Sequence, residues 1–200
     1  MNAKRPFILG LTGSIGMGKS AVAQMLIDLG VPVFDADAAV HELQGPGGML
    51  LEEIEVEFPG TTGPEGVDRQ MLGAAVFGDK AALARLEAIV HPAVGAMRAQ
   101  FLKDNADKRL IVFDIPLLFE KGGTKEIDAV AVVSAPPELQ RERVLARPGM
   151  TEGKFERILG LQVPDSEKRR RADYVIDTGV SLTETREEVA RLVKAIGKSE

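Results

Sequence analysis

A glycine-rich octapeptide near the start of the chain carries the clearest chemical signal. Residues 13–20 read Gly-Ser-Ile-Gly-Met-Gly-Lys-Ser, which fits the phosphate-loop pattern G-x-x-x-x-G-K-[ST]. Glycines allow successive backbone N–H groups to turn toward phosphate oxygens, and a helix that begins near Lys19 adds its positive dipole end. Lys19 is expected to neutralise the β- and γ-phosphates, and the Ser20 hydroxyl to ligate Mg²⁺. The pattern at residues 13–20 predicts a site for a magnesium-bound triphosphate. The residues expected to bind the nucleotide there are Ser14, Gly16, Met17, Gly18, Lys19 and Ser20, together with the adjoining Ala21.

Two carboxylates, Asp35 and Asp37, follow a short apolar run at residues 31–34. In open α/β sheets, ligands lie at the carboxyl ends of the strands, so both side chains are expected to face the crevice of the phosphate loop. One of them could accept the proton of an attacking hydroxyl, or both could orient hydrated Mg²⁺. The alternative is that Asp37 only caps the helix that follows.

Arginines form a second group with chemical potential. Arg143 and Arg147 are four residues apart on a predicted helix and so share one face. Guanidinium groups bind phosphate oxygens in a planar fork, so this face is suited to close over the triphosphate as a lid, although it could also be solvated. The basic run at 168–171 is too short for a nucleic-acid patch, and we expect it to be solvated or to meet a small anion.

Apolar runs of strand length occur at residues 7–12, 31–34, 110–116, 128–133 and 174–176, and helical periodicity separates them. This alternation predicts an α/β fold in three layers, with a five-stranded parallel sheet between helices. A mostly helical insertion of roughly 60 residues lies between the second and third runs and is expected to form the wall for a second substrate. Inside it, Pro92 follows His91 and suits the first position of a new helix, so a helix break is predicted there.

Composition narrows the function classes. A length of 200 residues favours one α/β domain with insertions. A net charge of −5 and an aromatic content of 4% argue against a nucleic-acid partner. The chain lacks cysteine, which excludes disulfides and thiolate zinc sites. No signal peptide or membrane span is apparent, so we expect a cytoplasmic protein. We also expect it to be a monomer or a weak homo-oligomer.

Several motifs coincide in order, and together they resemble the dephospho-coenzyme A kinase family. They are Leu-Thr-Gly-Ser-Ile-Gly-Met-Gly-Lys-Ser at 11–20, Asp-Ala-Asp at 35–37, Asp-Arg at 68–69, the 86–92 stretch that ends in His-Pro, Pro-Leu-Leu-Phe-Glu at 116–120, Gln140 with Arg143 and Arg147, Arg157 with Gln162, and Ala-Asp-Tyr-Val-Ile-Asp at 172–177. The resemblance implies ATP-dependent phosphorylation of the ribose 3′-hydroxyl of dephospho-coenzyme A, the last step of coenzyme A biosynthesis. It also implies a P-loop kinase fold with a nucleotide-binding core (1–44, 104–138 and 168–200), a helical coenzyme-A domain (45–103) and a lid (139–167).

The resemblance assigns roles by position. Asp37 is expected to accept the hydroxyl proton, with Asp35 beside it. Lys19 and Arg143 are expected to act in the transfer, with Arg147 as a second lid arginine on the phosphates. The residues expected to line the acceptor site are Asp35, Arg69, His91, Pro116 and Leu117.

Two departures from the family pattern are visible. Ala21 stands where the family often has Thr, and Thr178-Gly179 shifts by one residue a glycine that often follows Asp177. The residues that contact adenine, and the choice between ATP and GTP, are therefore left open. A small-molecule kinase of the nucleoside-monophosphate or shikimate type is the alternative enzyme, but the motifs of the insertion argue against it. A nucleotide switch would need D-x-x-G and N-K-x-D motifs, which the sequence lacks.

Overall fold

A computed structural model describes residues 5–120, 122 and 126–197. Five strands form one sheet in the order β2-β5-β1-β6-β7. They are β1 (Phe7–Thr12), β2 (Val33–Asp35), β5 (Leu110–Asp114), β6 (Ala129–Ser134) and β7 (Tyr174–Asp177). Every run predicted as a strand forms one, with ends shifted by at most two residues. The predicted α/β fold class is confirmed.

Strand β1 lies at the centre of this sheet and leads directly into the phosphate loop. It pairs in parallel with β5 on one side, where Leu9 is opposite Val112, and with β6 on the other, where Leu9 is opposite Ala129. Strands β5 and β6 are buried along their whole length. Continuous burial explains why their sequences are apolar at every position rather than at alternate ones.

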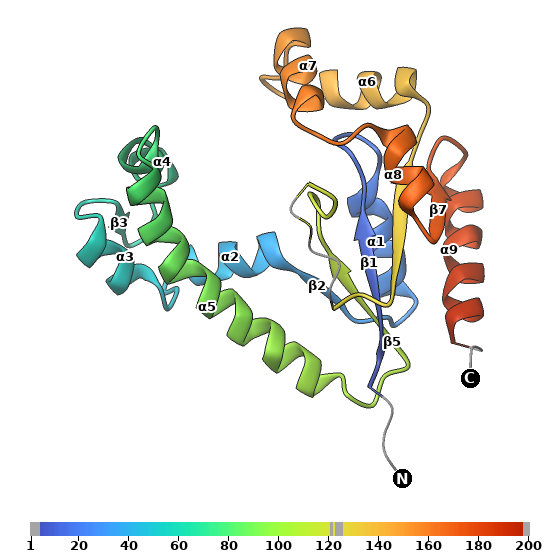
Figure 1. The fold of residues 1–200 in the computed structure, drawn as a ribbon, viewed down its shortest axis with the longest axis horizontal. Helices are drawn as coiled ribbons and strands as arrows, with labels where there is room; N and C mark the ends of the chain where they lie inside the picture. The colour runs from blue at the N-terminus through green and yellow to red at the C-terminus, as the bar shows by residue number, and fades with distance from the viewer. Residues whose placement is uncertain (1–4, 121, 123–125, 198–200) are drawn as a thin grey trace. The chain divides into compact units, whose positions relative to one another are not determined.

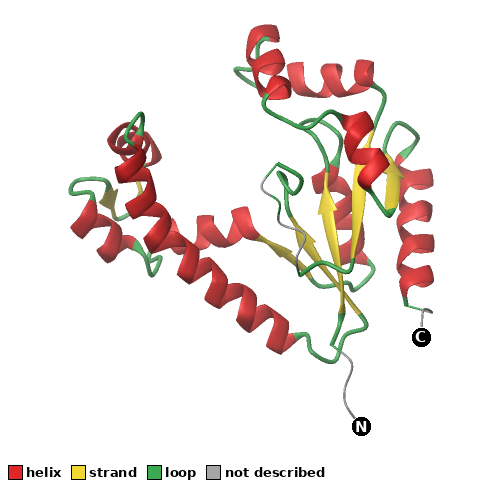
Figure 2. Ribbon diagram, viewed as in Figure 1, coloured by secondary structure: helices red, strands yellow, loops and turns green. Residues whose placement is uncertain are grey.

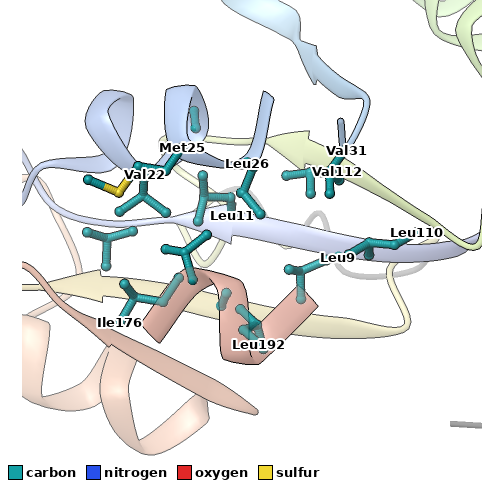
Figure 3. Packing of buried hydrophobic residues seen from close by; sticks show 14 of the residues in the cluster. Leu9, Leu11, Val22, Met25, Leu26, Val31, Leu110, Val112, Ile176 and Leu192 are labelled. Atoms are coloured by element: carbon teal, nitrogen blue, oxygen red, sulfur yellow. The ribbon is translucent and has the colours of Figure 1, made fainter. Parts of the chain in front are cut away.

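Helices α1 (Lys19–Asp28) and α9 (Leu182–Ile196) cover one face of the sheet. Leu26 and Leu192 pack there with Leu9 and Leu11 of β1, as Figure 3 shows. Residues of β6 with the opposite orientation, such as Val132, pack under Leu118 and Phe119 on the other face. Apolar side chains thus pack against both faces of the sheet. Figure 2 shows its strands in yellow.

The same part of the chain contains three further helices, α6 (Pro137–Leu145), α7 (Glu152–Gly160) and α8 (Asp165–Arg171). Arg141 of α6 forms an ion pair with Glu152 of α7, and its Nε lies 2.9 Å from Glu152 Oε1. Thr151 caps α7 by accepting a hydrogen bond from the Lys154 N–H. In the part of the chain described, no helix is long and apolar enough to cross a bilayer.

The chain divides into two compact units, residues 1–34 with 105–200 and residues 35–104. The second unit contains α2 (Ala36–Gln44), α3 (Leu51–Glu57), a hairpin of β3 (Thr62–Gly63) and β4 (Gly66–Val67), α4 (Arg69–Val76) and α5 (Lys80–Asp104), coloured from light blue to green in Figure 1. Its core is a separate cluster of buried residues, which includes Leu43, Ile54, Phe58 and Leu72. The functional division into core, acceptor domain and lid stays a prediction.

The predicted helix break at Pro92 is wrong. Helix α5 runs through Pro92 without interruption from Lys80 to Asp104. A proline inside a helix removes one hydrogen bond and costs about 3 kcal/mol. Apolar side chains pack against the core of the second unit both before Pro92, at Leu86 and Ile89, and after it, at Val94 and Met97. Packing on both sides favours one continuous helix and offsets the local cost.

Candidate active site

The phosphate loop joins β1 to α1, and two of its glycines are in the left-handed region. Gly16 has φ of 78° and Gly18, the residue before α1, has φ of 86°. A Cβ atom at Gly16 would lie 2.4 Å from Val144 Cγ2 and 2.9 Å from the Gln140 carbonyl oxygen. Gly16 is therefore required both by the backbone conformation and by the close approach of α6.

Lys19 and Asp114 form an ion pair at the end of the central strands. The Lys19 side chain is 17% exposed and that of Asp114 is 4% exposed, so the pair is largely shielded from water. Asp114 is the last residue of β5, next to β1 in the sheet. The end of β5 thus places a carboxylate against the lysine of the loop, at the edge of the sheet where ligands lie in open α/β folds.

A cavity of about 400 Å³ lies over the loop. Eight of the predicted site residues line it, namely Ser14, Gly16, Gly18, Lys19, Ser20, Pro116, Arg143 and Arg147. Met17 does not: its side chain is buried, and its sulfur accepts a hydrogen bond from the Ala135 N–H. The lining also lacks Ala21 and Leu117. The cavity is bounded by backbone amides and cations, which is the chemistry that a polyphosphate requires.

Arg143 is anchored at one side of this cavity by Thr178. Its Nη2 donates to the Thr178 carbonyl oxygen at 2.7 Å, and its Nη1 lies 3.2 Å from the Thr178 hydroxyl. That hydroxyl in turn donates to the carbonyl oxygen of Met17 at 2.7 Å. The segment after β7 therefore connects Arg143 with the phosphate loop.

Asp35, and not Asp37, caps helix α2. Asp35 Oδ1 accepts hydrogen bonds from the N–H groups of Asp37 and Ala38, at 2.8 and 3.0 Å. The alternative role of Asp37 as the helix cap is thus wrong, because β2 extends one residue beyond the predicted run. Asp37 is exposed in the first turn of α2, where the helix dipole stabilises its negative charge.

The other predicted acceptor residues of the second unit lie on its helices. Arg69 is the first residue of α4, whose cap Asp68 accepts hydrogen bonds from Gln70 and Met71. The Arg69 guanidinium donates to Nδ1 of His41, and both side chains are exposed. His91 is exposed within α5. These groups are available to an anionic ligand without loss of buried contacts.

Comparison with known proteins identifies the family. The sequence model of the dephospho-CoA kinase family matches residues 7–184. The chain belongs to the dephospho-CoA kinase family. It is 71% identical to the dephospho-CoA kinase of Novosphingobium aromaticivorans over 192 residues, which cover 96% of each chain.

Solved structures of similar proteins agree with this membership. The protein TT1252 from Thermus thermophilus superposes with a TM-score of 0.81 at 36% identity, over 96% of this chain and 98% of the other. The dephospho-CoA kinase from Campylobacter jejuni superposes with a TM-score of 0.65 at 26% identity, again over 96% and 98%. The resemblance predicted from the motifs is confirmed.

Several residues at the site of this dephospho-CoA kinase family member were not predicted. Ile15, Ile158 and Gln162 also line the cavity. Gln162 belongs to the motif that pairs it with Arg157, and this motif was the signal in the sequence that could have identified it. Lys168, predicted to be solvated or to bind a small anion, is instead fully buried, with its Nζ 2.9 Å from Glu120 Oε1. Its partner lies 48 residues earlier in the chain, so no local pattern indicates the pair.

The residues present fit a magnesium ion that is held mainly by its nucleotide. Among residues 5–120, 122 and 126–197, no group of three His, Cys, Asp or Glu side chains could hold a metal. Mg²⁺ in kinase sites needs only one or two protein oxygens, because phosphates and waters supply the others. Ser20 lines the cavity, and the Asp114 carboxylate lies beside Lys19. The Ser20 hydroxyl and the Asp114 carboxylate are oxygen donors of the kind that this requirement calls for.

Proposed function

We propose that this chain transfers the γ-phosphoryl group of ATP to the ribose 3′-hydroxyl of dephospho-CoA, giving coenzyme A and ADP. Membership of the dephospho-CoA kinase family over residues 7–184 carries this proposal. The cavity over the phosphate loop supports it, because the loop amides, Lys19, Arg143 and Arg147 converge there. The cavity supplies the donor half of a two-substrate site.

The donor half binds the triphosphate through fixed positive groups. The backbone amides of residues 16–20 and the N-terminus of α1 bind the phosphate oxygens, and Lys19 neutralises them. Mg²⁺, held by Ser20 and Asp114 together with the nucleotide, would supply charge neutralisation at the transferred group. Arg147 then binds phosphate oxygens, while Arg143, fixed by Thr178, stabilises the charge of the transferring group from its side of the cavity.

The acceptor half is assigned to Asp35, Asp37, Arg69, His91, Pro116 and Leu117. Asp37 accepts the proton of the 3′-hydroxyl as that oxygen attacks the γ-phosphorus and the bond to ADP breaks. The cap role of Asp35 supports this assignment, since its Oδ1 is occupied by two N–H groups and Asp37 is not needed for capping. Arg69 binds an anionic group of the acceptor, next to His41.

A coupled ADP-release assay tests the function. Dephospho-CoA is compared with adenosine, AMP and shikimate as acceptors at saturating Mg-ATP. We expect turnover with dephospho-CoA alone, and turnover only with one of the other acceptors would overturn the proposal. The same assay with GTP determines the donor preference. The cytoplasmic location and the state of monomer or weak homo-oligomer stay predictions, and sedimentation analysis tests the latter.

A further inference from the structure

Two glutamines bind the peptide backbone of Ile15 from opposite ends of the segment 137–165. Gln140 Nε2 donates to the Ile15 carbonyl oxygen at 2.7 Å. The Ile15 N–H donates to Gln162 Oε1 at 3.1 Å. Both polar groups of one residue in the phosphate loop are therefore bound by side chains, one from α6, which carries Arg143, and one from the segment after α7.

The contact with Gln140 is part of a close interface between α6 and the loop. Gln140 is 5% exposed, and its carbonyl oxygen occupies the space in which a side chain of residue 16 would lie. Val144, one turn later on α6, is fully buried against the same position. Arg143 lies on this helix, and Arg147 lies two residues after its end. The contact between Gln140 and the loop therefore also sets how far these two arginines lie from the loop.

Buried polar contacts fix the other end of the segment. The Val163 N–H, next to Gln162, donates to Glu120 Oε1 at 2.8 Å. Glu120 also pairs with the buried Lys168, and Asp165 accepts a hydrogen bond from the Ser134 hydroxyl at 2.8 Å. Gln162 is thus held where its amide oxygen meets Ile15.

We infer that Gln140 and Gln162 are positioning residues for phosphoryl transfer, which couple the shape of the phosphate loop to the placement of Arg143 and Arg147. This inference rests on the proposed function. When phosphate oxygens bind the loop amides that follow Ile15, the two glutamines keep that peptide, and with it α6, in the arrangement that the transfer requires. Neither glutamine takes part in bond making.

The two amides have opposite chemical requirements, which makes the inference testable. Gln140 must donate to a carbonyl oxygen, whereas Gln162 must accept from an N–H group. A glutamate can still accept at position 162 but, when ionised, cannot donate at position 140. We therefore compare Gln140→Glu and Gln162→Glu, with Gln70→Glu at an exposed position of α4 as a control for the charge change.

We expect kcat of Gln140→Glu at pH 8 to fall by about tenfold or more, because a carboxylate faces a carbonyl oxygen. For Gln162→Glu we expect kcat within about twofold of wild type, with a raised KM for ATP, because the new charge lines the phosphate cavity. At lower pH a protonated carboxyl at position 140 regains a donor, so the deficit of Gln140→Glu relative to wild type should narrow. A role confined to the stability of the fold would leave kcat per folded enzyme molecule unchanged in both variants.

Two further measurements separate a failure of this inference from a failure of folding or of the proposed function. If Gln140→Glu does not fold, Gln140→Met removes the donor without adding charge, and its ATP affinity, measured by calorimetry, should fall about fivefold. Equal kcat losses for the two glutamate variants, or wild-type kcat and ATP affinity for Gln140→Met, would overturn the inference. If the wild-type chain itself does not phosphorylate dephospho-CoA, the proposed function fails, and ATP affinity alone decides the role of the glutamines.

Discussion

The phosphate-loop region and the second unit present their polar groups in opposite ways. In the loop region the groups are already bound to protein partners: Lys19 to Asp114, Arg143 to Thr178 and the Ile15 peptide to two glutamines. In the second unit, Asp37 and His91 are exposed on helices. Preorganised groups lose little freedom when a ligand binds, whereas exposed side chains have to be ordered at that moment. Changes in the loop region should therefore alter binding and rate together, and changes in the second unit should alter the rate with ATP affinity retained.

Lys19→Met gives the largest expected effect. It removes the cation from the phosphate site and leaves the Asp114 carboxylate, 4% exposed, without that partner. We expect kcat/KM for ATP to fall by about 10²–10³-fold, together with weaker ATP binding measured by calorimetry. Lys194→Met, an exposed change on α9, is the control. Undiminished activity of Lys19→Met would show that the loop at residues 13–20 does not bind the phosphates of ATP.

Lys168→Met tests how much the buried ion pair with Glu120 contributes to the stability of the unit that contains the phosphate loop. The change leaves the Glu120 carboxylate without its buried partner, and we expect the free energy of unfolding to fall by about 3 kcal/mol, as urea denaturation measures. Arg169→Met, on an exposed position of the same helix, should change stability by less than about 0.5 kcal/mol. Equal effects of the two substitutions would mean that the buried pair contributes nothing to stability.

Asp37→Asn tests the second unit. We expect kcat to fall by about 10²-fold through loss of the general base, with ATP affinity unchanged. Asp35→Asn is the variant for comparison, because asparagine still accepts the N–H groups of Asp37 and Ala38 and so keeps the helix cap. If turnover of Asp37→Asn stays near normal while Asp35→Asn is impaired, the base is Asp35.

The smallest expected effect is a pH dependence of stability that originates at Glu120. Burial raises the pKa of this carboxyl, but the hydrogen bonds from Lys168 and the Val163 N–H outweigh it, so the pKa lies below the ordinary 4.5. The unfolded chain therefore binds the proton more tightly than the folded chain, and the stabilisation is complete above pH 4.5. It is lost as the pH falls through the lowered folded pKa. The stability difference between wild type and Glu120→Gln, measured by urea denaturation, should be constant from pH 7 to 5 and shrink below 4.5; a constant difference down to pH 3 would contradict this assignment.

Sequence patterns predicted the structure correctly where neighbouring residues determine it. The apolar runs predicted all five strands, and the glycine spacing predicted the loop between β1 and α1. Sequence patterns failed where contacts with residues far away in the chain determine the local structure. Nothing near Lys168 indicates that Glu120 will bury it, and nothing near Pro92 indicates that packing on both sides will keep α5 continuous.

The difference between Asp35 and Asp37 has another cause. Both carboxylates stand at the end of an apolar run, and the capping residue is simply the one at which the strand stops. The strand ends one residue later than the apolar run, and periodicity does not place the ends of elements to within one residue. The identity of the capping residue therefore depends on a boundary that the sequence does not encode locally.

The bare backbone at Gly16 limits how parts of this chain can be exchanged with those of other kinases. The carbonyl oxygen of Gln140 and a methyl group of Val144 occupy the volume that any side chain at position 16 would need. A chimera that takes its phosphate loop from one kinase and its arginine-bearing helix from another would combine surfaces that were not shaped for each other. A functional chimera therefore has to take the phosphate loop and helix α6 from the same kinase.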